Sequence, residues 1–170
     1  MSSRFRVELL AAQSRKDFDC GNDSLNAYLR RQAGQDQRKR FTICYLLMET
    51  DTDKVAGYFA MSAGGIPATD LPEATSKRLP RYPSIPVVRI GRLAISTEYQ
   101  GQGVGGTLLF DAIRRASTSE FGVYAIVVDA IDDAAVSFYQ HHGFICFGDD
   151  PRSLFLPVSD GLKQILNRKR

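Results

Sequence analysis

Residues 96–110 read STEYQGQGVGGTLLF and place four glycines between two segments of regular structure. Before this turn, residues 87–96 (VVRIGRLAIS) have the β-branched composition of a central strand. After it, residues 107–116 (TLLFDAIRRA) repeat apolar side chains at helical spacing. Backbone amides at a glycine-rich helix start can converge on an anion, and the helix dipole adds to the attraction. The stretch predicts a strand, a turn suited to a diphosphate and a helix; a purely structural turn is the alternative interpretation.

Two common nucleotide-binding motifs do not fit this turn. No Lys-Ser or Lys-Thr pair follows the glycines, so the turn lacks the lysine and the Mg²⁺-binding hydroxyl of a nucleotide-hydrolysing P-loop. A dinucleotide-binding fingerprint belongs to the first strand–helix unit of its domain, whereas this turn lies near residue 100.

Short β-branched, aromatic or alternating runs predict the strands of a sheet. We expect strands over residues 5–10, 41–49, 55–63, 87–96, 123–130, 145–148 and 153–157. The continuous apolar run at 123–130 suits a strand that is buried on both faces. This order predicts a mixed sheet with helices on its faces, in one domain that spans residues 1–170.

Capping residues predict two further helices. Asn22 or Asp23 can cap the first, whose apolar residues recur at helical spacing and face inward. Gly34 weakens the middle of this segment, so two short helices are the alternative. Asp132 or Asp133 can cap the second, which reads AAVSFYQHHGF.

Composition excludes several classes of protein. Of the 170 residues, 44% are hydrophobic and 24% are charged, and the net charge is 22 − 19 = +3. The 10 Phe and 7 Tyr supply enough apolar surface to exclude disorder as the main state. No apolar run approaches the roughly 20 residues of a membrane span, and the first residues are a poor match to a signal peptide. We therefore expect a cytoplasmic protein that does not associate with membranes.

Cysteine and histidine are too sparse to predict a metal centre. Cys20, Cys44 and Cys146 are far apart in the sequence and are expected to be buried thiols in a reducing compartment. His141 and His142 are adjacent, so on a helix they would point about 100° apart and could not share an ion. No metal is expected.

Positive charge is concentrated in one short segment. Five basic residues are offset there by Asp36 alone: Arg30, Arg31, Arg38, Lys39 and Arg40. Such a run is either a solvated helix face or a surface for a polyanion such as RNA, and composition does not separate the two.

The glycine-rich turn resembles motif A of the GNAT superfamily of acyl-CoA-dependent acetyltransferases. The signature Gln/Arg-x-x-Gly-x-Gly/Ala is filled by residues 100–105, QGQGVG. A second GNAT signature, F-Y-x-x-x-G-F, is matched by Phe138, Tyr139, Gly143 and Phe144. The resemblance covers residues 87–147 and implies an α/β (α+β) fold: a mixed, mostly antiparallel sheet of six to seven strands with splayed central parallel strands, flanked by about four helices.

The GNAT resemblance also implies a cofactor site. Acetyl-CoA would be the acetyl donor, with its pyrophosphate on the amides of Gln100, Gly101, Gln102, Gly103, Val104, Gly105 and Gly106. Its pantetheine arm would run like an added strand along the backbone of Leu93, Ala94 and Ile95. Tyr139 matches the tyrosine that protonates the departing thiolate in many members; the alternative is a core aromatic residue.

No side chain is an obvious general base, and this bears on the acceptor. A lysine amine, with a pKa of about 10.4, must lose a proton before it attacks, whereas an α-amino group, at about 7.7–8.0, is already substantially neutral. The chain is therefore better suited to α-amines.

A narrower resemblance is to the GNAT toxins of bacterial type II toxin–antitoxin systems. The matching residues are Phe18, Cys20, Gly21, Leu25, Tyr28 and Leu29, followed by Arg92, Leu93 and Ala94. Such toxins acetylate the α-amine of the amino acid on charged tRNA and so inhibit translation. The resemblance implies RNA contacts by Arg30, Arg31, Arg38, Lys39, Arg40, Arg89 and Arg92, a ribbon-helix-helix antitoxin and a homodimer. Acetylation of a small-molecule amine or a protein N-terminus is the alternative.

Overall fold

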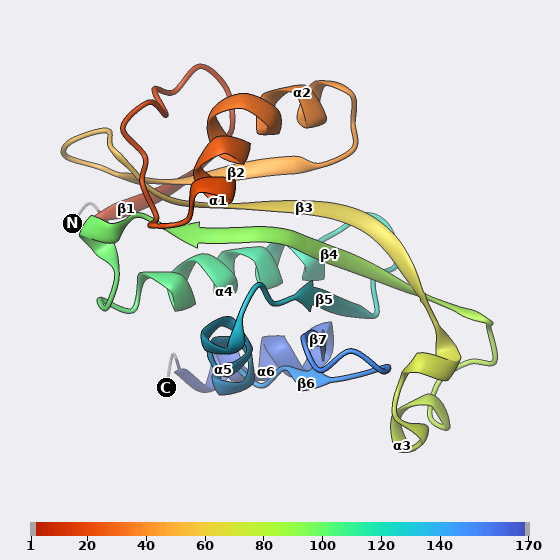
Figure 1. Cartoon of the computed structure of the whole chain (residues 1–170). Coiled ribbons are helices and arrows are strands. Elements are labelled where there is room, and N and C mark those ends of the chain that lie inside the picture. Colours follow the sequence, from red (N-terminus) through yellow and green to blue (C-terminus); the bar gives the residue numbers. More distant parts are fainter. Residues whose placement is uncertain (1–2, 169–170) are drawn as a thin grey trace. The chain divides into compact units, whose positions relative to one another are not determined.

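The computed structural model describes residues 3–168 of the chain, with side chains up to residue 167. The described strands form a mostly antiparallel sheet of seven, in the order β1-β2-β3-β4-β5-β7-β6, with one parallel pair, β4–β5 (Figure 1). The residues divide into two compact units: unit 1 contains 3–62 and 91–112, and unit 2 contains 63–90 and 113–168. Strands β3 and β4 and helix α4 each contribute residues to both units.

Unit 1 is built on antiparallel pairing, in agreement with the mostly antiparallel sheet that the GNAT resemblance implied. Its strands are β1 (Phe5–Leu9), β2 (Ile43–Glu49), the first part of β3 (Val55–Pro67) and the end of β4 (Ser84–Ile95). Phe5 pairs with Glu49, and Ile43 pairs with Met61. Strands β3 and β4 are longer than expected, and β3 continues through two glycines to Pro67.

One continuous helical segment covers the apolar core of unit 1. It comprises α1 (Asp23–Ala27), a π-helical turn (Tyr28–Gln32) and α2 (Ala33–Arg38). Asn22 is the cap, because its side chain accepts from the Leu25 amide at 3.0 Å. The irregularity is not at Gly34: the Ala33 amide donates to the Tyr28 carbonyl five residues back, which widens the turn.

Helix α4 (Val104–Ser117) begins inside the glycine-rich turn, three residues earlier than the apolar pattern indicated. A 3₁₀ turn (Thr97–Tyr99) connects it to the end of β4. Its inward face is fully buried and consists of Leu108, Leu109, Ala112 and Ile113. The order of strand, glycine-rich turn and helix is the one that the glycine-rich stretch predicted.

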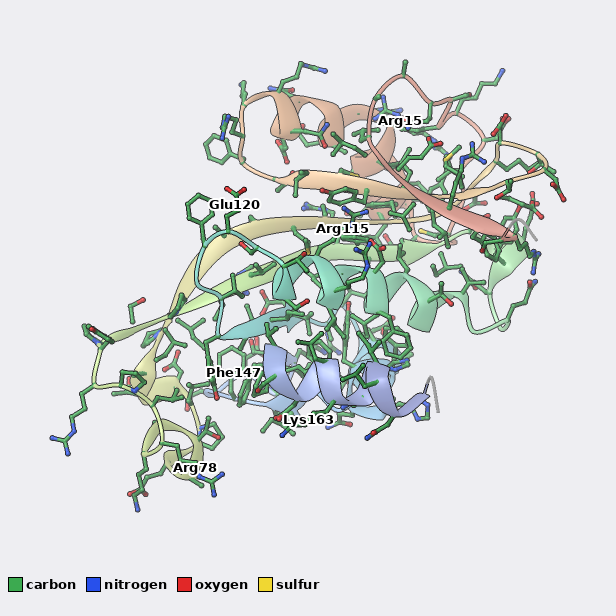
Figure 2. The ribbon with its side chains drawn as sticks, turned by 180° about the vertical axis from the view of Figure 1, so that it is seen from behind. Arg15, Arg78, Arg115, Glu120, Phe147 and Lys163 are labelled. Carbon is green, nitrogen blue, oxygen red and sulfur yellow. The ribbon has the colours of Figure 1, made fainter. Side chains whose placement is uncertain are left out.

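Unit 2 contains the parallel pair and the closing hairpin. Strand β5 (Ala125–Asp129) pairs with β4 in parallel and with β7 (Ser153–Pro157) in the antiparallel sense, and β6 (Ile145–Cys146) pairs with β7. The three central side chains of β5 are buried, as expected for a strand covered on both faces. Phe147, which is labelled in Figure 2, packs edge-to-face on Phe155 in the core of this unit.

Among the described residues, three α-helices lie wholly in unit 2. Helix α5 (Asp133–His141) is capped by Asp132, which accepts from the Ala135 amide at 2.8 Å. A short helix, α3 (Glu73–Ser76), lies in the proline-rich connection between β3 and β4. Helix α6 (Val158–Arg168) was not predicted. Its Gly161 looks like a breaker, but an added Cβ there would lie 2.9 Å from Ile113 Cγ2, so the glycine permits close packing.

The helices and the cysteines can be compared with what the sequence predicted about membranes and buried thiols. Within residues 3–168, no helix has the length and apolar character that crossing a membrane requires. Cys44 is buried and Cys20 is partly buried, but Cys146 is exposed, so the expectation of three buried thiols is wrong. Cys146 lies on β6, a two-residue strand at the end of the strand order, where little packs over it.

Candidate functional site

The glycine-rich turn has a backbone that side chains disfavour. Gly101 has φ +78° and Gly103 has φ +75°, both in the left-handed region. A Cβ added at either position would meet no atom within 4 Å, so backbone conformation, not crowding, requires glycine. The space around both residues is open to a ligand.

The first amides of α4 directly follow Gly103. The Thr107 amide donates to the Gly103 carbonyl at 3.3 Å, which is the first bond of the helix. The amides of Val104, Gly105 and Gly106 precede it and therefore have no acceptor within the helix. Together with the dipole of a 14-residue helix, they fit a diphosphate. The Val104 side chain is 4% exposed and belongs to the core.

The side chain of Gln100 holds the start of the turn. Its Nε2 donates to the Ile95 carbonyl at 2.9 Å and to the Cys20 carbonyl at 3.0 Å. Sequence reasoning assigned Gln100 to a motif but missed this anchoring role. A glutamine at this position is visible in the sequence, whereas its acceptor on Cys20, 80 residues away, is not.

The end of β4 has one edge available for an added strand. Parallel pairing with β5 runs from Val87 to Ile90, and β4 continues to Ile95. The Ala94 carbonyl is directed at β3, since it lies 2.8 Å from a Cβ built on Gly57. Because backbone groups alternate along a strand, Leu93 and Ile95 face the opposite edge. Of the three expected backbone contacts, this geometry favours Leu93 and Ile95 over Ala94.

Tyr139 lies in α5 of unit 2 and is 7% exposed. Its ring contacts Phe138 and Phe144, with ring centroids 5.1 and 5.3 Å apart. Burial raises the pKa of the phenol above its usual value, so the group stays protonated in neutral solution. That is the protonation state that a proton donor needs.

The basic residues of the helical segment are exposed, all in unit 1. They are Arg30 and Arg31 on the π-helical turn, Arg38 at the end of α2, and Lys39 and Arg40 after it. Arg30 also donates to the Phe18 carbonyl, and this bond ties the turn to the preceding loop. Nearby, Arg15 Nη1 donates to the Leu29 carbonyl at 2.9 Å (Figure 2).

The two basic residues of β4 differ in their partners. Arg92 lies in unit 1, with its guanidinium carbon 3.6 Å from the centroid of the Tyr28 ring. The Tyr28 hydroxyl is fixed by Asp36 at 3.0 Å and Thr42 at 3.2 Å, so the ring is a rigid platform. A guanidinium held over a ring keeps N–H groups that can still meet an anion. Arg89, in unit 2, is paired with Asp129 at 2.6 Å.

Metal-ligating side chains do not gather in the part of the chain that the structure describes. Residues 3–168 contain no group of three or more histidine, cysteine, aspartate or glutamate side chains placed to hold an ion. The donors that converge at the glycine-rich turn are amide N–H groups, which suit an anion instead.

A family model, a relative of known function and solved structures all point to the same family. The family described as "Acetyltransferase (GNAT) domain" matches residues 45–153. A tRNA-acetylating toxin of Mycobacterium tuberculosis is 32% identical over 145 residues, which are 84% of this chain and 85% of the toxin.

Solved structures agree over nearly the whole chain. A tyrosine-to-phenylalanine mutant of KacT superimposes with a TM-score of 0.87 at 28% identity, covering 95% of this chain and 99% of that one. AtaT complexed with acetyl-methionyl-tRNAfMet gives 0.86 at 29% identity, with the same coverage. AtaT has also been solved with AcCoA in AtaTR, and with the C-terminus of the antitoxin AtaR. Motif, strand order and relatives thus agree, and the chain belongs to the GNAT family of acetyltransferases.

Proposed function

We propose that this acetyltransferase transfers the acetyl group of acetyl-CoA to the α-amine of the amino acid on charged tRNA, and so acts as a toxin that inhibits translation. The observation that carries the proposal is the 32% identity to a tRNA-acetylating toxin over 84% of the chain. A glycine-rich turn with free helix-start amides supplies a matching donor site in unit 1.

Binding of the donor is assigned to backbone groups. The amides of residues 100–106 would hold the pyrophosphate, and Leu93 and Ile95 would pair with the pantetheine amides as an added strand does. The thioester supplies an activated acetyl carbon when acetyl-CoA is bound. All these contacts use main-chain atoms, so the fold and the glycines, more than side-chain identity, determine affinity for the donor.

Tyr139 is assigned the proton transfer. The acceptor nitrogen forms a bond to the acetyl carbon, the C–S bond breaks, and the departing thiolate takes the phenol proton. The acceptor nitrogen gives up one proton to water, and the phenolate regains a proton from water before the next turnover. A thiol of pKa about 8.5 and a phenol of about 10 are close enough for this transfer. Burial raises the pKa of Tyr139. An apolar site also raises the pKa of the thiol that leaves, because it disfavours the charged thiolate.

Acceptor binding is assigned to the basic residues of unit 1 and to Arg89. Arg92 on its Tyr28 platform is the best positioned of them, since it lies on β4 immediately before Leu93. Arg30, Arg31, Arg38, Lys39 and Arg40 would contact phosphates of the RNA, which makes binding dependent on salt.

Further parts of the proposal concern assembly. We infer one acetyltransferase domain over residues 1–170, because β3, β4 and α4 run through both compact units and the family match spans both. By analogy with the AtaT–AtaR complex, we propose an antitoxin partner, with a ribbon-helix-helix fold, and a homodimeric toxin. The site of action would be the cytoplasm, where charged tRNA is found.

The deciding experiment presents several acceptors in parallel. Purified protein is incubated with radiolabelled acetyl-CoA and, separately, charged tRNAs, uncharged tRNA, polyamines and a peptide with a free N-terminus. We expect label on charged tRNA that mild alkali releases as an N-acetyl amino acid. Label on polyamines or peptide with none on any charged tRNA would refute the tRNA assignment and support the alternative.

A further inference from the structure

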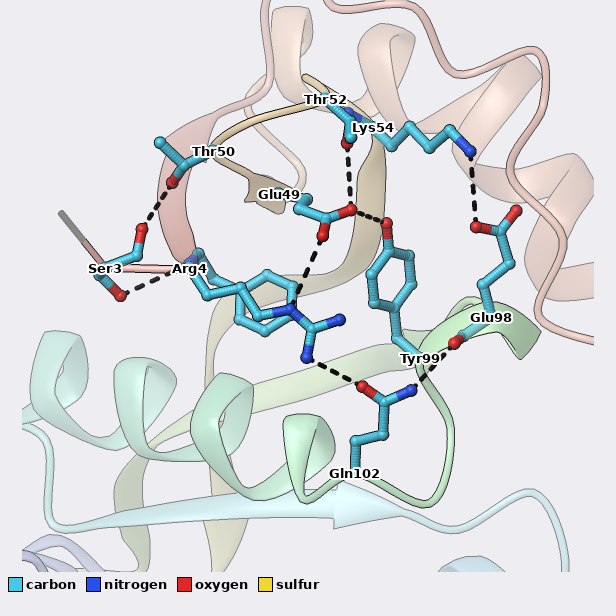
Figure 3. A network of polar contacts seen from close by, with 10 residues as sticks. Ser3, Arg4, Glu49, Thr50, Thr52, Lys54, Glu98, Tyr99 and Gln102 are labelled. Atoms are coloured by element: carbon cyan, nitrogen blue, oxygen red, sulfur yellow. Dashed lines mark hydrogen bonds and ion pairs between the residues drawn. The ribbon is translucent and has the colours of Figure 1, made fainter.

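Gln102 lies between the two left-handed glycines of the turn and is held at both ends of its amide. Its Oε1 accepts from Arg4 Nη1 at 3.0 Å, and its Nε2 donates to the Glu98 carbonyl at 3.1 Å (Figure 3). Arg4 is 98 residues away in sequence and directly precedes β1. The side chain of Gln102 therefore ties the middle of the turn to the first strand.

Arg4 is itself fixed by three neighbours. Its Nε lies 3.6 Å from Glu49 Oε1, and its guanidinium carbon lies 4.8 Å from the Phe5 ring centroid and 5.6 Å from that of Tyr99. One planar guanidinium thus meets a carboxylate and an amide oxygen at once, which the ammonium of lysine does not reproduce. The backbone is held as well, because the Thr50 amide donates to the Arg4 carbonyl at 2.8 Å.

Glu49, the partner of Arg4, is held in its ionised form. The Tyr99 hydroxyl and Thr52 Oγ1 both donate to its Oε2, the latter at 3.0 Å (Figure 3). Chiefly through the Tyr99 hydrogen bond, the pKa of Glu49 lies below its usual value. Tyr99 belongs to the 3₁₀ turn that leads into the glycine-rich turn, so both ends of this network reach the same loop.

We propose that Arg4 is a positioning residue for acetyl-CoA binding, acting through Gln102. This inference rests on the proposed donor site. A loop that already presents its amides in the bound arrangement does not have to become ordered when acetyl-CoA binds. A mobile loop does, and the free-energy cost of ordering it weakens the binding. Arg4 holds Gln102, and Gln102 holds Gly101 and Gly103 in the conformation that directs the amides outward. Arg4 touches neither the acetyl group nor the acceptor.

The test is a double-mutant cycle read by calorimetry with acetyl-CoA. We expect Arg4→Met and Gln102→Ala each to raise the dissociation constant by about 5- to 30-fold, the effect of losing one charge-assisted hydrogen bond. The double variant should bind no more weakly than the weaker single variant, because the two residues act as one unit. At saturating acetyl-CoA, the kcat of Arg4→Met should equal that of the wild type, and Arg4→Lys should not restore affinity.

Arg6→Met is the matched control, since Arg6 lies two residues after Arg4, on β1, and pairs with Glu8 and Asp53 on the surface. It should leave the dissociation constant unchanged. Three results would each overturn the inference. Arg4→Met could bind acetyl-CoA as tightly as the wild type, the losses of affinity could add in the double variant, or Arg6→Met could lose as much affinity as Arg4→Met. If the wild type itself binds no acetyl-CoA, the proposed function fails. If the wild type binds acetyl-CoA and the variants bind it equally well, the inference alone fails.

Discussion

The phenol of Tyr139 is enclosed by aromatic rings and carries a raised pKa. A group of this kind can be either a packing residue or a proton donor, and replacing the hydroxyl alone separates the two. Removing a general acid slows catalysis by about 10²- to 10⁴-fold. We expect Tyr139→Phe to lose turnover to this extent and to keep its affinity for acetyl-CoA, measured by steady-state kinetics and calorimetry.

Tyr124→Phe is the control for that substitution. Tyr124 is partly buried in the same unit and its pKa is also raised by burial, but it precedes β5 and has no assigned role. Full turnover in Tyr139→Phe would show that Tyr139 contributes packing alone.

The pH dependence of the reaction tests the acceptor and the donor together. An α-amino acceptor, with a pKa of about 7.7–8.0, predicts a rate that rises tenfold per pH unit and levels off near pH 8. The raised pKa of Tyr139 keeps the phenol protonated through the range in which a free tyrosine ionises, so no alkaline fall is expected up to about pH 10. An amide-linked analogue of charged tRNA, which resists alkaline hydrolysis, allows the measurement. A rise that continues to pH 10 would indicate a lysine-type amine, and a fall above pH 9 would contradict the protonated phenol.

Arg92 and Arg89 give a second comparison between single residues. Arg92→Gln should raise the KM for charged tRNA and lower the slope of log affinity against log salt by about 1. Arg89→Gln should have a smaller effect, since Asp129 already neutralises that guanidinium. Equal effects of the two substitutions would contradict the role assigned to the Tyr28 platform.

At the scale of elements, the proposed donor site is the junction of β4, the glycine-rich turn and α4. A side chain at φ +75° costs roughly 1–2 kcal/mol, and valine at position 103 would also project into the open space. We therefore expect Gly103→Val to weaken acetyl-CoA binding by at least about tenfold. Gly122→Val is the control, because Gly122 also has open space around it but no left-handed φ. Unchanged binding in Gly103→Val, measured by calorimetry, would remove the turn from the site.

Local patterns predicted most elements and the glycine-rich turn, because capping and periodicity depend on neighbours in sequence. Asn22 and Asp132 cap the helices assigned to them. Helix α6 was not predicted, and the close packing of its Gly161 against Ile113 depends on a residue 48 positions away in the sequence. The anchors of the turn were missed for a related reason: a glutamine side chain gives no sign of whether it meets an arginine 98 residues away.

At the scale of the whole molecule, the proposed activity has a consequence for the cell. Each acetylated tRNA is withdrawn from protein synthesis, so a catalytic toxin acts at low abundance. Controlled expression of the wild type should arrest growth and reduce incorporation of labelled amino acids, whereas Tyr139→Phe at equal abundance should do neither. Arrest by both proteins would mean that binding, not catalysis, is toxic.

The π-helical turn at Tyr28–Gln32 determines how the basic surface depends on chain length as well as on charge. Such a turn accommodates one residue more than a regular helix would, and the helix on either side stays in phase. Deleting the uncharged Gln32 would therefore restore regular winding and leave Ala33 buried and Arg38 facing as before. Deleting Gln35 from the regular helix α2 would instead rotate the residues after it by about 100°, with the number of positive charges unaltered. We therefore expect the proposed RNA recognition to tolerate the first deletion better than the second.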